Sequence, residues 1–320
     1  MSQADTIAVR VVAVQAVTPH IKHFKLAPET AGSLPAFSGG SHIIVVMQGG
    51  NRVHRNPYSL MGSPAQLEHY EISVRRMEES RGGSHFMHDE LKEGSVLDIA
   101  HPVNLFPLDK IARKHLLVAG GIGITPFIAQ LADLHSGNVP YELHYAARSP
   151  EHAAYREALE RAEGDRVRMY YRSDGERIDF TQLLSRQPLG THLYVCGAAA
   201  IVTNAVEAAR ACGWPASHIH WEKFSAPPVG DAFDVYLAKS RLRVHVLPDQ
   251  SLLEAIEAAG VEVPYLCRGG VCGFCRTGVV EVDGELVHND HFLSDEEKAS
   301  GNAIMPCVSR ARCKNLVLDL

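Results

Sequence analysis

Four cysteines in the last quarter of the chain have a spacing that suits metal ligation. Cys267, Cys272 and Cys275 stand in a C-x4-C-x2-C arrangement, and Cys307 follows 32 positions after Cys275. Thiolates are soft, anionic ligands that suit iron, and the glycines of this loop allow the backbone to fold tightly with its amides turned towards the sulfurs of a cluster. A zinc site normally has two C-x2-C pairs, and only one is present here. The spacing therefore predicts a plant-type 2Fe-2S cluster.

Other cysteines and histidines offer weaker alternatives for metal binding. Cys313 lies six positions beyond Cys307 and could compete as the fourth ligand, but the run Met305-Pro306-Cys307 fits the expected ligand context better. Among the 18 histidines, no second carboxylate or cysteine pattern accompanies the close pairs, so we expect ordinary surface histidines there. Those pairs are His218 with His220 and His288 with His291.

A glycine-rich turn could hold a diphosphate. Gly120-Gly121-Ile122-Gly123 follows the apolar run 115–119, and a helix is expected after it, with Thr125 as N-cap and Pro126 at its first position. Free amides and the positive end of a helix attract phosphate groups. The turn departs from the usual G-x-G-x-x-G pattern, so a plain strand-to-helix turn is the alternative.

Length, charge and hydropathy bound the class of protein. The chain has 320 residues and a mass of 35.0 kDa, which favours two or three domains. Its 31 basic and 37 acidic residues give a net charge of -6, which speaks against nucleic-acid binding. Residues 1–9 show no secretory signal, and the most apolar stretch, 116–132, contains three glycines and a proline. We therefore expect a cytoplasmic protein with no membrane span.

The pattern of short apolar runs divides the chain into three parts. Residues 1–108 show short strand-like runs, which favours an antiparallel β-barrel, and residues 109–226 alternate strands with helices, as in an α/β domain with a parallel sheet. A Pro- and Gly-rich linker at 226–231 precedes a third unit, 233–320. This unit begins with a hairpin and a short helix, for which Ser251 and Glu254 form a capping box.

The order of these motifs resembles that of one family over essentially the whole chain. The chain is similar to the phthalate dioxygenase reductase family, the single-chain reductases of two-component Rieske oxygenases, and within it to the reductases that serve carnitine and dimethylamine oxygenases. The resemblance implies a flavin β-barrel, an NAD-binding α/β domain and a β-grasp ferredoxin domain. The motifs that carry it are 56–60, 81–84, 120–126, 196–197, 222–224 and the four cysteines.

The resemblance implies an FMN site on the barrel. Tyr58 would lie against the flavin ring, and Ser59 would hydrogen-bond the ring nitrogen that accepts hydride. The family's more usual arginine two positions before the tyrosine is Asn56 here, with Arg55 directly before it. The other implied contacts are a phosphate site at Arg81, Gly83 and Ser84 and a strand with its backbone along the flavin at Ile72, Val74 and Arg75.

The resemblance also implies an NADH site in the α/β domain. Cys196 and Gly197 would face the nicotinamide, although the family's usual proline after this glycine is Ala198 here. The other implied residues on this side are Gly121, Ile122, Thr125, Glu222 and Phe224. Ser59, Cys196 and Glu222 are the residues implied to act at the reacting groups.

The implied function is electron transfer. NADH gives up two electrons together, a 2Fe-2S cluster accepts one at a time, and FMN converts between the two. We therefore expect a monomer that passes electrons from NADH through FMN to the cluster and on to a Rieske-type terminal oxygenase. Arg268 is a candidate for docking to that partner. Two alternatives stay open, namely an electron carrier with an inactive reductase half and a general NADH-dependent reductase without an oxygenase partner.

Overall fold

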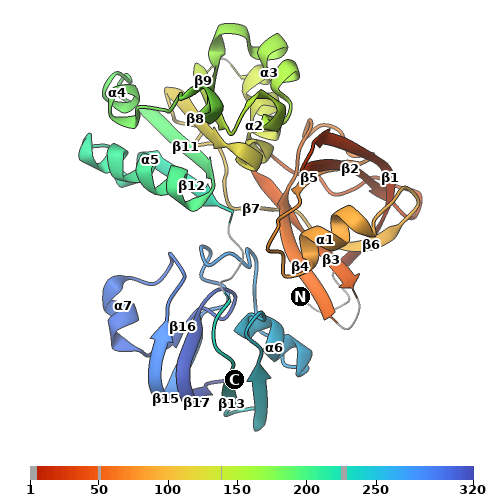
Figure 1. The fold of residues 1–320 in the computed structure, drawn as a ribbon, viewed down its shortest axis with the longest axis vertical. Coiled ribbons are helices and arrows are strands. Elements are labelled where there is room, and N and C mark those ends of the chain that lie inside the picture. Colours follow the sequence, from red (N-terminus) through yellow and green to blue (C-terminus); the bar gives the residue numbers. More distant parts are fainter. Residues whose placement is uncertain (1–5, 50–51, 138, 225–228) are drawn as a thin grey trace. The chain divides into compact units, whose positions relative to one another are not determined.

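The computed structural model describes residues 6–49, 52–137, 139–224 and 229–320, and it divides the chain into two compact units. The first unit is Thr6–Phe224, and the second contains Ser225–Leu320 (Figure 1). Residues 226–228 of the predicted linker lie outside the described residues. Within the described chain, no helix combines the length and the apolar character that a membrane crossing requires.

The first unit begins with the antiparallel barrel that the sequence predicts. Its strands follow the order β4-β3-β6-β1-β2-β5, and an isolated bridge between Met61 and Glu71 joins the region after β4 to β5. Fully buried side chains such as Phe24 and Tyr70 fill the interior. The elements are β1 (Thr6–Thr18), β2 (Ile21–Pro28), β3 (Ser41–Gly49), β4 (Arg52–Ser59), β5 (Tyr70–Arg75), α1 (Gly83–Asp89), β6 (Val96–Ala100) and β7 (Val103–Asn104).

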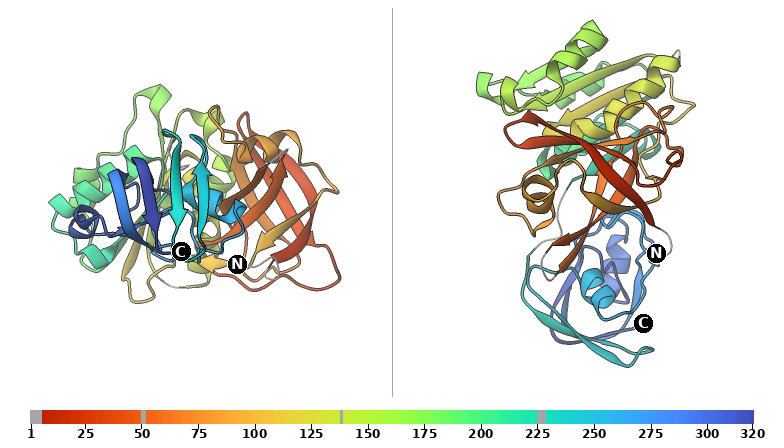
Figure 2. Two further views of the ribbon diagram at one scale, coloured as in Figure 1. Left: turned by 90° about the horizontal axis from the view of Figure 1, so that it is seen from below. Right: turned by 90° about the vertical axis from the view of Figure 1, so that its right-hand side faces the viewer.

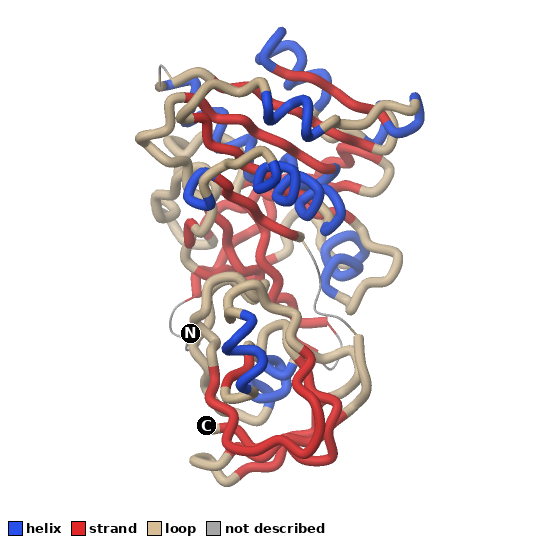
Figure 3. Tube along the Cα trace, turned by 90° about the vertical axis from the view of Figure 1, so that its left-hand side faces the viewer, coloured by secondary structure: helices blue, strands red, loops and turns tan. Residues whose placement is uncertain are grey.

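A five-stranded parallel sheet of order β10-β9-β8-β11-β12 completes the first unit. Helices cover the sheet (Figure 3). Leu117 and Tyr194 pack with side chains of α2 and α3 on one face, and Val118 and Val195 pack with α4 and α5 on the other. The elements are β8 (Lys114–Gly120), α2 (Thr125–Ser136), β9 (Tyr141–Ala147), α3 (Arg156–Glu163), β10 (Val167–Tyr171), α4 (Phe180–Ser185), β11 (Thr191–Gly197), α5 (Ala199–Ala211) and β12 (Ile219–Lys223).

Short 3-10 turns connect several of these elements, and one of them corrects an expectation. Thr125 is the first residue of α2 rather than its N-cap, because the 3-10 turn η2 (Gly121–Ile124) runs directly into the helix. The Thr125 hydroxyl donates to the carbonyl of Ile122 at 3.0 Å. Pro126 is therefore the second helical residue, one position later than predicted, and still lies in the first turn. The other turns are η3 (Pro150–His152), η4 (Gly164–Arg166), η5 (Arg172–Asp174) and η6 (Ala216–His218).

The second unit has a mixed sheet of order β14-β13-β17-β15-β16, with β13 and β17 parallel and the other pairs antiparallel. The helix α6 carries the predicted capping box of Ser251 and Glu254 and lies against the sheet (Figure 2). This is the predicted β-grasp arrangement. The elements are β13 (Phe233–Leu237), β14 (Leu242–Val246), α6 (Leu252–Ala258), β15 (Thr277–Val287), α7 (Asp295–Ser300), β16 (Ala303–Ile304) and β17 (Arg310–Leu318).

Candidate functional site

The carboxyl ends of β8 and β11 form a switch point in the parallel sheet. The chain continues from β8 to β9 on one side and from β11 to β12 on the other, and α/β sheets bind ligands beyond the strand ends at such a point. We call this region, beyond the carboxyl ends of β8 and β11, the crevice. The turn after β8 packs directly on the end of β11. A Cβ atom at Gly123 would lie 2.2 Å from the carbonyl oxygen of Cys196, so only glycine allows this approach.

Cys196 and Glu222 face each other beside this turn. The register of β11 and β12 pairs the two residues, and the Cys196 thiol donates to a Glu222 carboxylate oxygen at 3.9 Å. Burial, together with the carboxylate, raises the pKa of Cys196 well above its ordinary value, so the thiol stays protonated. The Phe224 amide donates to the carbonyl of Gly197 at 3.1 Å. The structure therefore brings together four of the residues predicted on the nicotinamide side, namely Cys196, Gly197, Glu222 and Phe224.

On the barrel, the structure brings Asn56, Tyr58 and Gly83 together. The Asn56 amide donates to the Tyr58 hydroxyl at 3.4 Å, and burial raises the pKa of Tyr58 to about 12. A Cβ atom at Gly83 would lie 2.3 Å from Nδ2 of Asn56, so the first turn of α1 lies directly against this side chain. Strand alternation places Ser59 on the opposite face of β4 from Tyr58, and its side chain is buried.

The strand β5 lies beside the turn η2, so the barrel and the parallel sheet meet at this place. The side chains of Ile72 and Val74 are buried in the barrel core. Only their backbone can face a ligand, as the resemblance implies for this strand. Arg75 at the end of β5 is exposed.

The predicted phosphate residues lie at the start of α1. Ser84 is buried, and its hydroxyl oxygen accepts from the Met77 amide at 3.2 Å while the hydroxyl donates to Ser80 at 3.0 Å. Arg81 is half-buried in the same turn. His88 at the other end of α1 contacts the carbonyl of Val74 at 2.8 Å, which fixes the helix to β5. The helix thus holds Arg81, Gly83 and Ser84 in one place next to β5.

A polar network at the meeting of barrel and sheet escaped the sequence analysis. The Tyr155 hydroxyl contacts Ser73 and lies 3.0 Å from Nδ1 of His23. The other ring nitrogen of His23 lies 3.3 Å from a carboxylate oxygen of Glu71. Tyr155 has a left-handed backbone with φ of 61°, which is uncommon for a residue other than glycine. No local pattern links positions 23, 71, 73 and 155, and only the fold brings them together.

In the second unit, the four predicted cysteine ligands form two pairs. The Sγ atoms of Cys275 and Cys307 lie 3.3 Å apart, and Cys267 hydrogen-bonds Cys272. This contact lowers the pKa of Cys272 to about 6, and the Cys307 contact lowers that of Cys275. None of these four cysteines forms a disulfide bond. A 2Fe-2S cluster takes two thiolates on each iron, so the pairing fits this cluster.

The backbone and one arginine support the cysteine loop. The Gly269 amide donates to Sγ of Cys267 at 3.3 Å, as the glycine content of the loop predicts. The expectation that Arg268 docks a partner is wrong, because its side chain is buried. It forms a two-pronged ion pair with Glu257 at 2.8 and 2.6 Å and lies over the ring of Tyr265. Arg268 therefore holds the loop to α6.

The expectation of ordinary surface histidines is wrong for His220 and for His288. Nε2 of His220 lies 3.0 Å from Nδ1 of His192, which in turn lies 3.7 Å from the Asp109 carboxylate. The His288 side chain is only 10% exposed, and its Nδ1 lies 3.5 Å from a carboxylate oxygen of Asp290. The partners of His220 are distant in the sequence, and the register of the sheet and the loop before β8 bring them to it.

Cys313, the alternative fourth cluster ligand, lies on β17 and is half-buried.

Comparisons with known proteins agree with this geometry. A family model for 2Fe-2S iron-sulfur cluster binding domains matches residues 235–312. A second model, for the N-terminal domain of dimethylamine monooxygenase subunit DmmA-like proteins, matches residues 102–219. The first match covers most of the unit with the paired thiols, and the second covers the strands β8 to β11 of the parallel sheet.

Relatives of similar length match nearly the whole chain. The chain is 46% identical to the carnitine monooxygenase reductase subunit of Acinetobacter baumannii, with 96% of each chain covered. It is 45% identical to the heme-dependent oxidative N-demethylase beta subunit of Ectopseudomonas mendocina, with 98% of each covered. Among solved structures, phthalate dioxygenase reductase superposes with a TM-score of 0.88 at 31% identity over 99% of both chains, and its description names electron transfer from pyridine nucleotides to [2Fe-2S].

Proposed function

Because the chain belongs to the phthalate dioxygenase reductase family, we propose that it is the NADH-dependent reductase component of a two-component Rieske oxygenase. The observation that carries this proposal is that one chain holds both a switch-point crevice beside a barrel and two pairs of thiols. When bound, a flavin supplies the conversion from two-electron to one-electron transfer, and a 2Fe-2S cluster supplies a one-electron carrier.

The residues of the crevice have distinct parts in this proposal. In this proposal Ser59 offers a hydroxyl to the flavin. Tyr58 offers an uncharged aromatic face, and burial raises the pKa of its hydroxyl further, to about 12. Cys196 is a neutral, buried thiol, so it shapes the nicotinamide pocket and does not act as a nucleophile. Glu222 accepts the hydrogen bond of this thiol and holds its direction.

The roles of the domains, the other cofactor contacts and the cluster ligands are likewise proposed from membership in the family. Residues 1–108 form the flavin barrel, 109–226 the NADH-binding domain and 233–320 the ferredoxin domain of a monomer. The proposed cofactor contacts are Asn56, Ile72, Val74, Arg75, Arg81, Gly83, Ser84, Gly121, Ile122, Thr125, Gly197 and Phe224. The proposed cluster ligands are Cys267, Cys272, Cys275 and Cys307.

A second class of oxygenase is also a candidate partner for this chain. The relative from Ectopseudomonas mendocina is named as a subunit of a heme-dependent N-demethylase, and it is as similar to this chain as the carnitine monooxygenase reductases are. A haem oxygenase is therefore the second candidate partner. Specificity for the organic substrate belongs to the oxygenase component in either case.

The test is a reconstitution with both candidate partners. The purified chain is mixed with NADH and with the terminal oxygenase of either a carnitine monooxygenase or a heme-dependent N-demethylase, and substrate turnover is measured. We expect turnover with the Rieske-type oxygenase, and we expect the Cys275→Ser variant to lose it while still reducing ferricyanide. Turnover with the haem oxygenase alone would overturn the Rieske assignment, and reduction of ferricyanide without turnover of either would indicate a general reductase.

A further inference from the structure

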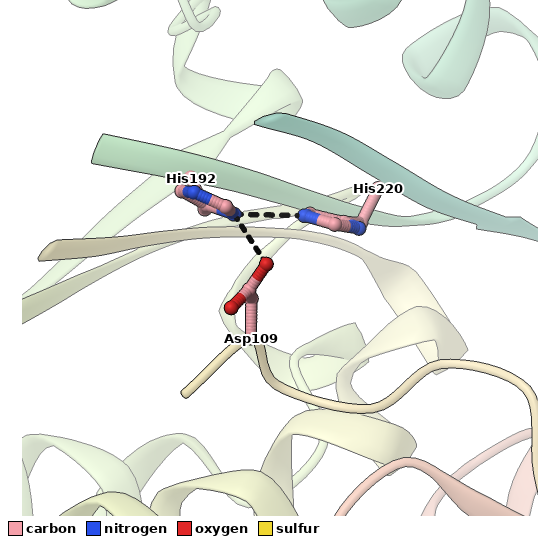
Figure 4. A group of neighbouring side chains, drawn as sticks. All are labelled: Asp109, His192 and His220. Carbon is pink, nitrogen blue, oxygen red and sulfur yellow. Dashed lines mark hydrogen bonds and ion pairs between the residues drawn. The ribbon is translucent and has the colours of Figure 1, made fainter. Parts of the chain in front are cut away.

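A cluster of two histidines and one aspartate lies at the amino ends of β11 and β12, opposite the crevice. His192 is on β11, His220 is on β12, and Asp109 belongs to the loop that connects the barrel to β8. Figure 4 shows the three side chains turned towards one another. Cys196 lies four positions after His192 on β11, which places the cluster roughly 13 Å along the strand from the crevice.

The distances between the three side chains suit a metal ion. Nδ1 of His192 lies 3.0 Å from Nε2 of His220 and 3.7 Å from Oδ2 of Asp109, and the three atoms all lie within 4.8 Å of one another (Figure 4). Two ligands of a tetrahedral zinc ion, with bonds of about 2.0–2.2 Å, lie roughly 3.3 Å apart. The observed distances lie on either side of that value.

Neighbouring groups fix the direction of two of the three side chains, those of Asp109 and His220. Oδ1 of Asp109 accepts from the Ile111 amide at 2.9 Å, which leaves Oδ2 turned towards His192. The Asp109 amide donates to the Tyr194 hydroxyl at 2.7 Å, and the Tyr194 ring stacks on His220 with centroids 4.4 Å apart. Outer partners of this kind orient the ligands of natural metal sites.

The ligand atoms suit a transition-metal ion. Burial is the main cause that lowers the pKa of both His192 and His220, which favours the neutral form of both rings. Neutral imidazole nitrogens and a carboxylate oxygen suit zinc and similar divalent transition ions. The Asp109 side chain is 31% exposed, which leaves a path for an ion and a position for water as a further ligand.

We propose that Asp109, His192 and His220 form a binding site for one divalent transition-metal ion of the Zn²⁺ class. Without the ion, one of the two facing nitrogens, Nδ1 of His192 or Nε2 of His220, carries a hydrogen. On binding, that ring changes tautomer, so that its hydrogen moves to the other nitrogen of the same ring. Both facing nitrogens then direct a lone pair at the ion. The ion then joins the connecting loop to β11 and β12 and stabilises the unit Thr6–Phe224. The proposal does not depend on the identity of the oxygenase, because it concerns the opposite edge of the sheet.

The test measures Zn²⁺ binding to the full, cofactor-loaded chain without a histidine tag. After mild treatment with EDTA, equilibrium dialysis against Zn²⁺ with elemental analysis gives the Zn²⁺ bound per chain, and iron is counted in the same sample. We expect one Zn²⁺ per chain with the iron content unchanged, and a rise in the thermal unfolding temperature. Zn²⁺ uptake only in samples that have lost iron would assign the ion to the cysteines and overturn the proposal.

Two variants and a matched control locate the ion. Asp109→Asn keeps an acceptor for the Ile111 amide but removes the charge, and His220→Gln removes a ligand. We expect both to bind Zn²⁺ at least about 100-fold more weakly. His135→Gln removes a histidine that pairs with Glu163 at 2.8 Å in the same unit, and it should bind as the unaltered chain does. Equal affinity of the unaltered chain and both site variants, or sulfur ligands in the X-ray absorption spectrum of bound zinc, would overturn the proposal.

Discussion

The cysteine loop and the crevice at the strand ends differ in how much of the chain each requires. Three of the four proposed cluster ligands stand within nine residues of the sequence. The fourth, Cys307, lies in the connection between β16 and β17, which brings it next to Cys275. The crevice needs residues from β4, β5, α1, η2, β11 and β12, which span positions 56 to 224. The first site depends on local spacing, and the second depends on the topology of a barrel and a sheet.

Because of this difference, we expect substitutions at the two sites to have different effects. A change in the cysteine loop should affect the cluster and leave chemistry at the crevice intact, because the ligands are local. A change at a close contact in the crevice should misplace groups that come from distant strands. Matched substitutions in the two regions test this contrast.

The largest effect is expected from Cys275→Ser, which removes one member of a thiol pair. A serine hydroxyl does not replace a soft thiolate on iron, so the chain should lose its cluster iron and all transfer to the oxygenase. Iron analysis and the visible spectrum check this. Cys313→Ser is the control and should keep the cluster. Loss of iron in both variants would mean that Cys313 serves as a ligand.

The next effect concerns the ion pair that holds the cysteine loop to α6. Arg268→Gln should lower the free energy of unfolding of the second unit by up to about 3 kcal/mol, since it removes the buried cation of a two-pronged ion pair whose carboxylate, that of Glu257, is half-buried. Chemical denaturation followed through the cluster absorbance measures this. Arg276→Gln removes an exposed pair with Glu297 and should cost at most about 1 kcal/mol. Equal losses in the two variants would contradict the structural role of Arg268.

At the crevice, Gly123→Ala should slow the oxidation of NADH by about 10- to 100-fold. The added Cβ atom meets the end of β11, so the turn must move away from Cys196, and small misplacements at reacting groups have effects of this size. Stopped-flow reduction by NADH measures the rate. Gly137→Ala has its nearest neighbour at 3.7 Å and should react at the normal rate. A normal rate for Gly123→Ala would show that the turn does not position NADH.

The smallest effect concerns the barrel carboxylate next to the crevice. Hydrogen bonding to His23, with His69 and Lys25 adding to it, lowers the pKa of Glu71 to about 2 from its ordinary value of 4.5. A lowered carboxyl pKa contributes stability that is present above about pH 4.5 and is lost as the pH falls towards 2. Glu71→Gln should therefore be less stable at pH 7 and should lose less stability between pH 4.5 and 2. Parallel pH profiles of the two proteins would contradict this.

Local patterns predicted much of the fold and of the cysteine site. The capping box at Ser251, the glycine turn after β8 and the cysteine spacing all depend on residues that are close in sequence. The predicted start of α2 was one residue too late, because the 3-10 turn η2 runs directly into the helix. Short 3-10 turns are frequent at the ends of α-helices, and the local sequence did not separate the two. The burial of Arg268 could not be predicted, since it depends on the packing of α6 against the loop.

Local sequence patterns could not predict the contacts between residues that are distant in the chain. The network of Tyr155 with His23 and the cluster of Asp109, His192 and His220 each join segments that no spacing relates. The roles assigned to Ser59, Cys196 and Glu222 came from the family resemblance, and they stay predictions until the variants are measured. The structure contributes the proximity of Cys196 to Glu222 and the raised pKa of the thiol.

The most direct test of the proposed electron relay is an anaerobic titration of the loaded chain with NADH. The visible spectrum reports the flavin, and low-temperature electron paramagnetic resonance reports the cluster. We predict that NADH bleaches the flavin and produces the rhombic signal of a reduced 2Fe-2S centre, and that Cys275→Ser shows only the bleaching. An intact cluster and flavin that NADH leaves oxidised would contradict the account and favour an electron carrier with an inactive reductase half.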